Sequence, residues 1–238
     1  MTPDLRQRAV DLPELMDDPA ADLRMLERTY QRFELVNALV SRPGLLYRRH
    51  VRPRARRGEV RILDIGAGGG DLCRYMARRL RREGLSARIT ALDPDERAID
   101  WARTHDGSAG VDYRCADSAT LAAAGEQFDI IVSNHLLHHL DSAELAALLR
   151  DSETLVAPGG VVAHQDIARG RAAYALYAVG TAPFAKNFLA GSFIRTDGLR
   201  SIRRSHTATE LDALAPDGWQ VRSALPARLE LRWEHPLG

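Results

Sequence analysis

The spacing of hydrophobic positions changes twice along the chain. Within Leu23–Val40, apolar side chains recur every three or four residues, as on one face of an amphipathic helix. From Val60 onward, short apolar runs alternate with helical patterns, which indicates βαβ units around a parallel sheet. The predicted strands are Val60–Ile65, Ala87–Leu92, Val111–Cys115, Phe128–Ser133 and Val161–His164, and the predicted helices between them are Leu72–Arg82, Asp95–His105 and Ser142–Leu155.

The last third of the chain departs from this alternation. Residues 166–206 include a small and apolar stretch, Ala172–Ala185, which is too short to span a bilayer and which we expect to cover one end of the sheet as a helix. A capping box predicts a further helix over Thr207–Leu214. The closing strands, expected as an antiparallel pair, are Trp219–Leu225 and Arg228–Trp233.

Composition narrows the class of protein. The 238 residues are 45% hydrophobic and 27% charged, which is ordinary globular usage. The net charge of +1 offers no basic field for nucleic acid. Cys73 and Cys115 form no CxxC pair, which excludes a cysteine-built metal site and favours a reducing, cytoplasmic setting. We expect neither a signal peptide nor a transmembrane segment, and the almost exclusive use of arginine over lysine indicates a GC-rich bacterial genome.

The segment Arg42–Arg57 is basic, with seven arginines and no acid. Its simplest interpretation is a solvated connector, and the alternative is a docking surface for a carrier protein, a lipid headgroup or another anion. We therefore expect an N-terminal helical cap over residues 1–57 and a main domain over 58–238. Residues 166–206 would form a helical substrate-cap insertion within that domain.

A glycine-rich loop, DIGAGGGD at Asp64–Asp71, follows the first strand and opens a helix. Glycines there allow a tight turn and a close approach of the backbone to a ligand. The dinucleotide fingerprint GxGxxG would require a glycine at position 71, where this chain has an aspartate, which argues against an NAD-dependent oxidoreductase. A carboxylate at each end disfavours a pyrophosphate, whereas Asp64 suits a ligand with a cationic amino-acid end.

DIGAGGGD resembles the first motif of the class I S-adenosylmethionine-dependent methyltransferases. Later landmarks follow in order: Asp93 after the second strand, CADS at 115–118, SNHLLHHL at 133–140 and PGG at 158–160. The resemblance implies a Rossmann-like α/β fold with a seven-stranded, mostly parallel sheet and one antiparallel C-terminal strand, an N-terminal helical cap and a helical insertion after the fifth strand.

The same resemblance implies S-adenosylmethionine as the cofactor and S-adenosylhomocysteine as its product. It puts Asp93 on the two ribose hydroxyls and Asp117 on the adenine amino group, although either aspartate could instead be a simple helix cap. The cofactor-binding residues that it implies are Asp64, Gly66, Ala67, Gly68, Asp93, Pro94, Ala116, Asp117, Ser118, Asn134 and His135.

Methyl transfer from a sulfonium is an in-line displacement, for which the protein aligns the acceptor with the donor carbon. A phenol or enol acceptor benefits from a histidine base. The candidate bases are His135 first, then His139 and His164, and each could instead be a core residue. The run HLLHHLD lacks the HExxH spacing, so we predict no metal site.

The helix around Tyr30 and Phe33 and the segment beginning at Tyr174 are expected to wall a flat or lipophilic small-molecule acceptor. Two stretches, ERTYQRFELVNALVSR and DGLRSIRRSHTATEL, are similar to methyltransferases of quinone biosynthesis and of type III polyketide pathways in secondary metabolism. That similarity implies a phenolic or quinonoid acceptor, O-methylation before C-methylation, and Arg203 near an anionic oxygen of the acceptor. The alternatives are a catalytically silent or carrier-protein-associated subunit and an NAD-dependent oxidoreductase, and we expect a monomer or homodimer.

Overall fold

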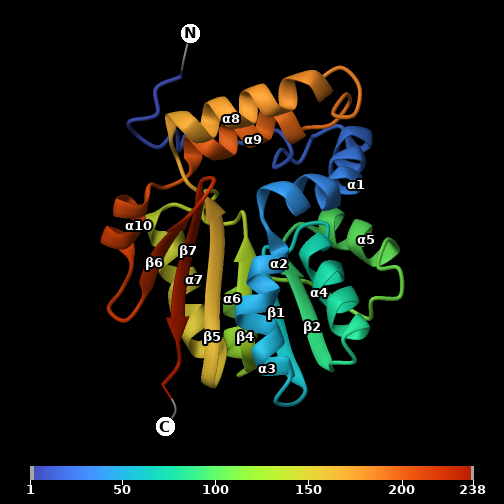
Figure 1. Ribbon diagram of the computed structural model, residues 1–238, viewed down its shortest axis with the longest axis vertical. Coiled ribbons are helices and arrows are strands. Elements are labelled where there is room, and N and C mark those ends of the chain that lie inside the picture. Colours follow the sequence, from blue (N-terminus) through green and yellow to red (C-terminus); the bar gives the residue numbers. More distant parts are fainter. Residues whose placement is uncertain (1–2, 237–238) are drawn as a thin grey trace.

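A seven-stranded sheet with helices on both faces forms the body of the protein (Figure 1). The computed structural model describes residues 3–236. The strand order is β3-β2-β1-β4-β5-β7-β6, and β7 alone is antiparallel to its neighbours β5 and β6. The predicted sheet is therefore confirmed. The strand order reverses between β1 and β4, and open α/β sheets bind their ligands at such a switch point.

The strands and helices follow the order that the sequence predicts. The strands are β1 (Val60–Ile65), β2 (Ala87–Asp93), β3 (Asp112–Cys115), β4 (Phe128–Asn134), β5 (Val156–Ile167), β6 (Gln220–Ala224) and β7 (Arg228–Glu234). The α-helices are α1 (Leu23–Val40), α2 (Pro43–Leu46), α3 (Arg52–Ala55), α4 (Asp71–Arg82), α5 (Glu96–Thr104), α6 (Ser118–Ala123), α7 (Ser142–Leu155), α8 (Arg171–Thr181), α9 (Ile194–Arg204) and α10 (Ala208–Leu214). A π-helical turn, η1 (Tyr47–Val51), joins α2 to α3, and a 3-10 turn, η2 (Ala182–Phe184), follows α8.

The central strands are buried on both faces, which explains their nearly continuous apolar sequences. Alternate residues enter two cores because successive side chains of a strand point to opposite faces. Ile62 packs toward α4 and η1, whereas its neighbour Leu63 packs toward α7. The two cores hold the carboxyl ends of β1, β2 and β4 at one edge, where the loops after these strands meet.

The basic segment 42–57 is not a solvated connector, so that interpretation is wrong. Leu46, Tyr47 and Val51 are fully buried and join the core beside β1 and α4. The helical turns send these apolar side chains inward and leave several arginines outside. Three of those arginines already have carboxylate partners, in the pairs Arg49–Glu230, Arg52–Glu83 and Arg54–Glu234. Docking of an anion through 42–57 stays a prediction.

Some local boundaries differ from the predictions. β5 begins at Val156, so the PGG sequence at 158–160 lies inside the strand, where the register with β4 shifts, and is not a turn before it. Asp141, not Ser142, is the N-cap of α7, because its carboxylate accepts from the amides of Ala143 and Glu144. The expected cap of α5 by Asp95 is confirmed.

Two helices form a layer over the carboxyl ends of the strands (Figure 1). α8 and α9 pack side by side there, which confirms the helical insertion after the fifth strand. The N-terminal segment before α1 is tied to this layer, since the Asp197 carboxylate accepts from the amides of Leu15 and Met16. The pieces that cover the sheet edge therefore come from both ends of the chain.

Candidate active site

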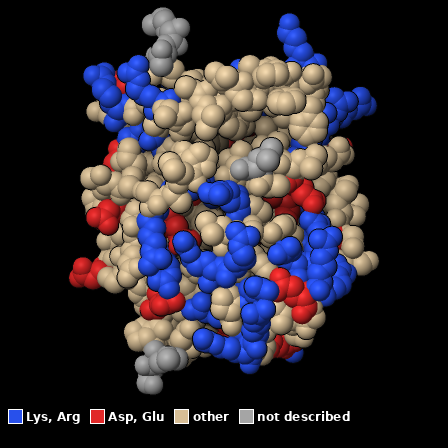
Figure 2. Space-filling view, in the orientation of Figure 1, with Lys and Arg blue, Asp and Glu red and all other residues tan. Residues whose placement is uncertain are grey.

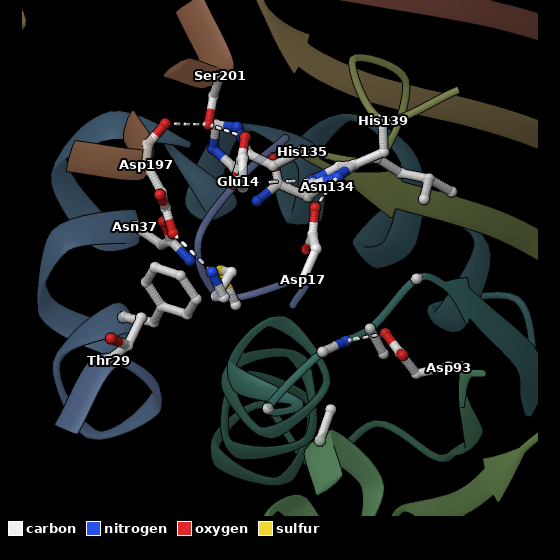
Figure 3. A pocket seen from close by; sticks show the side chains of 18 of the residues that line it. Glu14, Asp17, Thr29, Asn37, Asp93, Asn134, His135, His139, Asp197 and Ser201 are labelled. Atoms are coloured by element: carbon white, nitrogen blue, oxygen red, sulfur yellow. Dashed lines mark hydrogen bonds and ion pairs between the residues drawn. The ribbon is translucent and has the colours of Figure 1, made fainter. Parts of the chain in front are cut away.

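A cavity of about 790 Å³ lies between the carboxyl edge of the sheet and the covering layer (Figure 3). This size is within the range of small-molecule and cofactor sites. Its walls come from the glycine-rich loop, the turn after β4, α1, α8, α9 and the N-terminal segment. The predicted residues that line it are Tyr30, Phe33, Asp64, Gly66, Ala67, Gly68, Asp93, Pro94, Asn134, His135 and His139.

The glycine-rich loop has the tight geometry that its sequence indicates. Gly66, Gly68 and Gly70 all adopt positive φ angles, of 70°, 50° and 74°, which side-chain-bearing residues rarely do. A Cβ atom on Gly66 would lie 2.8 Å from Leu136 Cδ1. The loop is fastened to the second strand because the amide of Gly68 donates to Asp93 Oδ2 over 2.7 Å.

Two carboxyl groups border this loop, Asp64 buried and Asp93 half-buried. Asp64 Oδ2 accepts from the Cys73 thiol, while Oδ1 has no hydrogen-bond partner among the described residues. Burial raises the pKa of Asp64 to about 8. Burial also raises the pKa of Asp93, whose oxygens accept from the amides of Gly68 and Asp95. Each carboxylate oxygen can accept a second hydrogen bond, so both groups keep acceptor capacity toward the cavity.

The residues expected around an adenine ring do not line the cavity. The Asp117 carboxylate caps α6 and accepts from the amide and hydroxyl of Thr120. Ser118 donates its hydroxyl to Asp151, and Ala116 belongs to the core on the α7 side. Asp117 is therefore a helix cap, as the alternative interpretation predicted, and a contact with adenine stays a prediction.

His138 is a buried cation held between two carboxylates. It lies in a turn after β4. Its Nδ1 is 2.9 Å from Asp166 Oδ1 and its Nε2 is 3.1 Å from Glu14 Oε1. Burial opposes the charged form, but the two carboxylates together raise the pKa of His138 to about 10. A histidine that already carries its proton cannot act as a base.

His135 is held in its neutral form. Arg228 Nη1 lies 3.2 Å from its Nε2, and a guanidinium can only donate, so Nε2 is an acceptor and Nδ1 carries the proton. The Ser41 hydroxyl lies 2.7 Å from the same Nε2. Burial and the Arg228 charge lower the pKa of His135 to about 4. The first-choice base is therefore a poor proton acceptor in this position.

His139 has the arrangement of an oriented base. Its Nδ1 lies 3.0 Å from Asp17 Oδ2, and part of the ring is exposed to the cavity. A carboxylate on Nδ1 leaves Nε2, which lies 4.0 Å from Glu14 Oε2, to accept a proton, as in histidine–aspartate pairs of hydrolytic enzymes. Figure 3 shows the Asp17 carboxylate next to the His139 ring.

His164 does not line the cavity, so it is wrong as a candidate base. The ring is fully buried in β5, where Nδ1 contacts the Ser133 hydroxyl and Nε2 contacts the Ser152 hydroxyl. It stacks against Trp219. Burial lowers its pKa to about 3. His164 is a satisfied core residue, which was the alternative interpretation of this position.

Two of the four residues predicted to contact the acceptor line the cavity, and their contact with an acceptor stays a prediction. Tyr30 and Phe33 line the cavity, but Tyr174 packs in a small core with Ile202, and the lining residue is Tyr177, one turn further along α8. Arg203 does not line the cavity either. Its neighbour Arg204 is buried and donates to the carbonyls of His138 and His139, which holds the histidine turn in place.

The N-terminal segment supplies functional residues that the sequence analysis missed. Glu14 and Asp17 contact the histidines, and Ser201 of α9 donates to Glu14 Oε1 over 2.6 Å. The run ELMDD at residues 14–18 has no helical or strand period that would mark it as part of a site. Its only available signal was the surplus of acids close to the aromatic helix α1.

In two groups of side chains, the potential ligand atoms lie close enough together to bind one metal ion. Glu14, His138 and His139 each place one ligand atom within 4.8 Å of the others, and so do His135, His138 and Asp166. Ion pairing already accounts for these contacts, because the His138 charge is balanced by two carboxylates. The expectation that no metal takes part stays a prediction.

Comparisons with known proteins find similarity in the part of the chain that forms this cavity. The family described as "Methyltransferase domain" matches residues 62–160, which span the glycine-rich loop, Asp93 and the histidine turn. Residues 62–160 thus match a methyltransferase domain. A ubiquinone biosynthesis O-methyltransferase of Parvibaculum lavamentivorans is 35% identical to the chain over 166 residues, 68% of this chain and 61% of the relative. A second protein of that name, from a Methylobacterium species, is 38% identical over 50% of this chain and 45% of its own length. The chain thus spans less than two thirds of these curated relatives.

Solved structures show that the fold around the methyltransferase domain is shared. The plantazolicin methyltransferase BpumL, in complex with a triazolic desmethylPZN analog and SAH, has a TM-score of 0.61 at 14% identity and 93% coverage of both chains. The N-methyltransferase NodS of Bradyrhizobium japonicum, in complex with S-adenosylhomocysteine, has a TM-score of 0.53 at 19% identity and covers 82% of this chain and 86% of its own. Within residues 3–236, no helix has the length and apolar character needed to cross a membrane.

Proposed function

We propose that this protein transfers a methyl group from S-adenosylmethionine to an oxygen of a small phenolic or quinonoid acceptor. One observation carries the proposal: a single cavity joins the glycine-rich loop, with Asp64 and Asp93, to the His139–Asp17 pair. A cofactor subsite and an oriented base thereby face the same space. The names of the curated relatives, ubiquinone biosynthesis O-methyltransferases, support an oxygen acceptor on a ring of this kind.

The residues at the loop fit this cofactor. The free Oδ1 of Asp64 is a buried acceptor suited to the cofactor's ammonium group, and the Asp93 carboxylate can accept from both ribose hydroxyls. The positive-φ glycines leave room for the backbone to approach the ligand closely. When bound, the cofactor supplies an activated methyl group, and the chain has to align and deprotonate the acceptor.

His139 is the residue to which we assign proton acceptance. Asp17 fixes its tautomer, so that Nε2 receives the proton as the acceptor oxygen attacks. His138 remains protonated between Asp166 and Glu14 and anchors the turn. Tyr30, Phe33 and Tyr177 contribute aromatic side chains to the wall, which suits a flat acceptor.

A methylation screen tests the proposal. Purified protein is incubated with S-adenosylmethionine and a panel of phenols, catechols, resorcinols and hydroquinones, and the products are analysed by mass spectrometry. We expect methyl ethers of one ring class, formed only by protein with an intact His139. If the panel yields carbon-methylated rings, or no product although S-adenosylhomocysteine binds, then the proposed oxygen transfer is wrong.

Replacement of Asp93 by alanine should weaken binding of S-adenosylhomocysteine. The change removes the carboxylate that would accept hydrogen bonds from the ribose hydroxyls. It also removes the hydrogen bond that the amide of Gly68 donates to Asp93. We expect an affinity loss of about 10- to 150-fold, equal to about 1.5–3 kcal/mol. Calorimetric titration measures it, and Asp117→Ala, at a carboxylate outside the cavity, shows in parallel whether the adenine contact exists. Unchanged affinity in Asp93→Ala would refute the ribose assignment.

A further inference from the structure

The outer face of α8 and the turn after it expose several large apolar side chains, which we call the α8 surface. Monomeric proteins rarely gather such side chains on one face without a binding partner. The fractional exposures are 60% for Leu176, 72% for Val179, 50% for Phe184 and 39% for Phe188. In the view of Figure 2, uncharged side chains cover the molecule along α8, with Lys and Arg toward both ends.

The charged side chains that residues 170–196 contribute to the α8 surface are all positive. Residues 170–196 contain no aspartate or glutamate. Arg171 is the first residue of α8 and Lys186 follows the helix, both exposed, and the Arg32 guanidinium lies 5.4 Å from the centre of the Phe188 ring. An apolar strip between cations matches a surface that is apolar beneath a layer of negative charge.

The inner face of α8 belongs to the cavity. Tyr177 lines the cavity and donates its hydroxyl to the carbonyl of Ile194, while Ala173 is buried against the sheet edge. One helix thus separates the proposed acceptor space from the exposed apolar strip.

We propose that the α8 surface docks on an anionic phospholipid bilayer, so that a lipophilic acceptor enters the cavity beside α8. The docking surface follows from the exposed side chains and their charges, and the role in acceptor entry rests on the proposed function. The apolar part of α8 is too short to span, so the helix lies along the interface with Leu176, Val179 and Phe184 inserted.

The same charges disfavour a second copy of this chain as the occupant. A two-fold contact would bring one α8 surface against another. Neither copy would offer an acid from residues 170–196 to Arg171 or Lys186 of the other. The arginine-rich segment 42–57 differs in this respect, because part of its charge is neutralised by Glu83, Glu230 and Glu234.

Co-sedimentation of the full chain with vesicles tests the proposal. We expect binding to vesicles of phosphatidylglycerol and phosphatidylcholine, and little binding to phosphatidylcholine alone. The double variant Leu176→Asp/Val179→Asp should lower the partition coefficient by at least about tenfold, because two inserted side chains become charged. Arg171→Gln/Lys186→Gln should lower it by about tenfold on anionic vesicles and reduce its salt dependence.

Matched controls separate docking from folding and from cofactor binding. Leu214→Asp changes a leucine on α10 that is 39% exposed and lies outside the α8 surface, and it should leave the partition coefficient unchanged. All variants should keep the wild-type unfolding temperature and affinity for S-adenosylhomocysteine, so a failure of docking is distinguishable from a failure of the proposed function. The proposal is overturned if wild-type protein ignores anionic vesicles, if the variants partition equally, or if the aspartates instead dissociate a dimer that does not bind vesicles.

Discussion

Replacing His139 by alanine should lower kcat for methyl transfer by about 100- to 10,000-fold, the usual contribution of a positioned general base. The affinity for S-adenosylhomocysteine should stay within about twofold, because the ring contacts Asp17 and the acceptor side of the cavity. The loss follows from geometry: the Nδ1 atom of His139 is bound by the Asp17 carboxylate, and its Nε2 atom faces the cavity with Glu14 Oε2 4.0 Å away, beyond hydrogen-bond distance.

Two further variants test the assignment to His139. Asp17→Asn keeps the shape but weakens the control of the tautomer, so kcat should fall less than in His139→Ala while the folded state is preserved. His135→Asn should change cofactor affinity more than kcat, since Arg228 and Ser41 already occupy the accepting nitrogen of His135. Single-turnover rates measure both effects. If His135→Asn loses most of its kcat while His139→Ala stays active, then His135 and not His139 is the general base.

Replacing Asp64 by asparagine should stabilise the ligand-free protein and impair cofactor binding at once. The folded state raises the pKa of Asp64 from 3.8 to about 8, so between these values the folded chain holds a proton that the unfolded chain has released. Stability is therefore lost as the pH rises from 4 to 8, and asparagine removes that loss. At pH 8 we expect a gain of about 1–4 kcal/mol in the free energy of unfolding, measured by urea titration.

The same carboxyl group makes cofactor affinity depend on pH. Only the ionised form of Asp64 can pair with an ammonium group, so affinity for S-adenosylhomocysteine should rise as the pH increases from 6 to 8. In Asp64→Asn this rise should disappear, and affinity should be about 10- to 100-fold weaker at pH 8. Calorimetry at several pH values measures both. A variant that is no more stable and binds equally well would show that Asp64 is only a structural residue.

The cofactor end of the cavity could be predicted from the sequence because its residues lie in short contiguous motifs. The loop Gly66–Gly70 and Asp93 each sit at the end of a strand with a clear apolar pattern, so the parallel sheet brings them together. Positive φ at Gly66 and Gly68 confirms the conformational argument for glycine. The seven strand segments also followed from the apolar pattern, whereas the single antiparallel strand of the sheet was implied by the resemblance to class I methyltransferases.

The acceptor end could not be predicted, for two physical reasons. Glu14 and Asp17 reach the histidines from a segment without regular periodicity, so only tertiary packing reveals them. On α8, two tyrosines lie three residues apart, and the sequence does not tell which face turns inward: Tyr177 lines the cavity and Tyr174 does not. The pattern alone also cannot separate a histidine bonded within the core, such as His164, from one that faces a ligand.

Calorimetric titration of the purified protein with S-adenosylhomocysteine, with NAD as the comparison, tests the central claim most directly. The cavity geometry predicts one equivalent of S-adenosylhomocysteine bound per chain and no heat from NAD, with the binding weakened in Asp93→Ala. Binding of NAD, or of neither compound, would contradict the assignment of the glycine-rich loop to a sulfonium cofactor, and the proposed methyl transfer would be wrong with it.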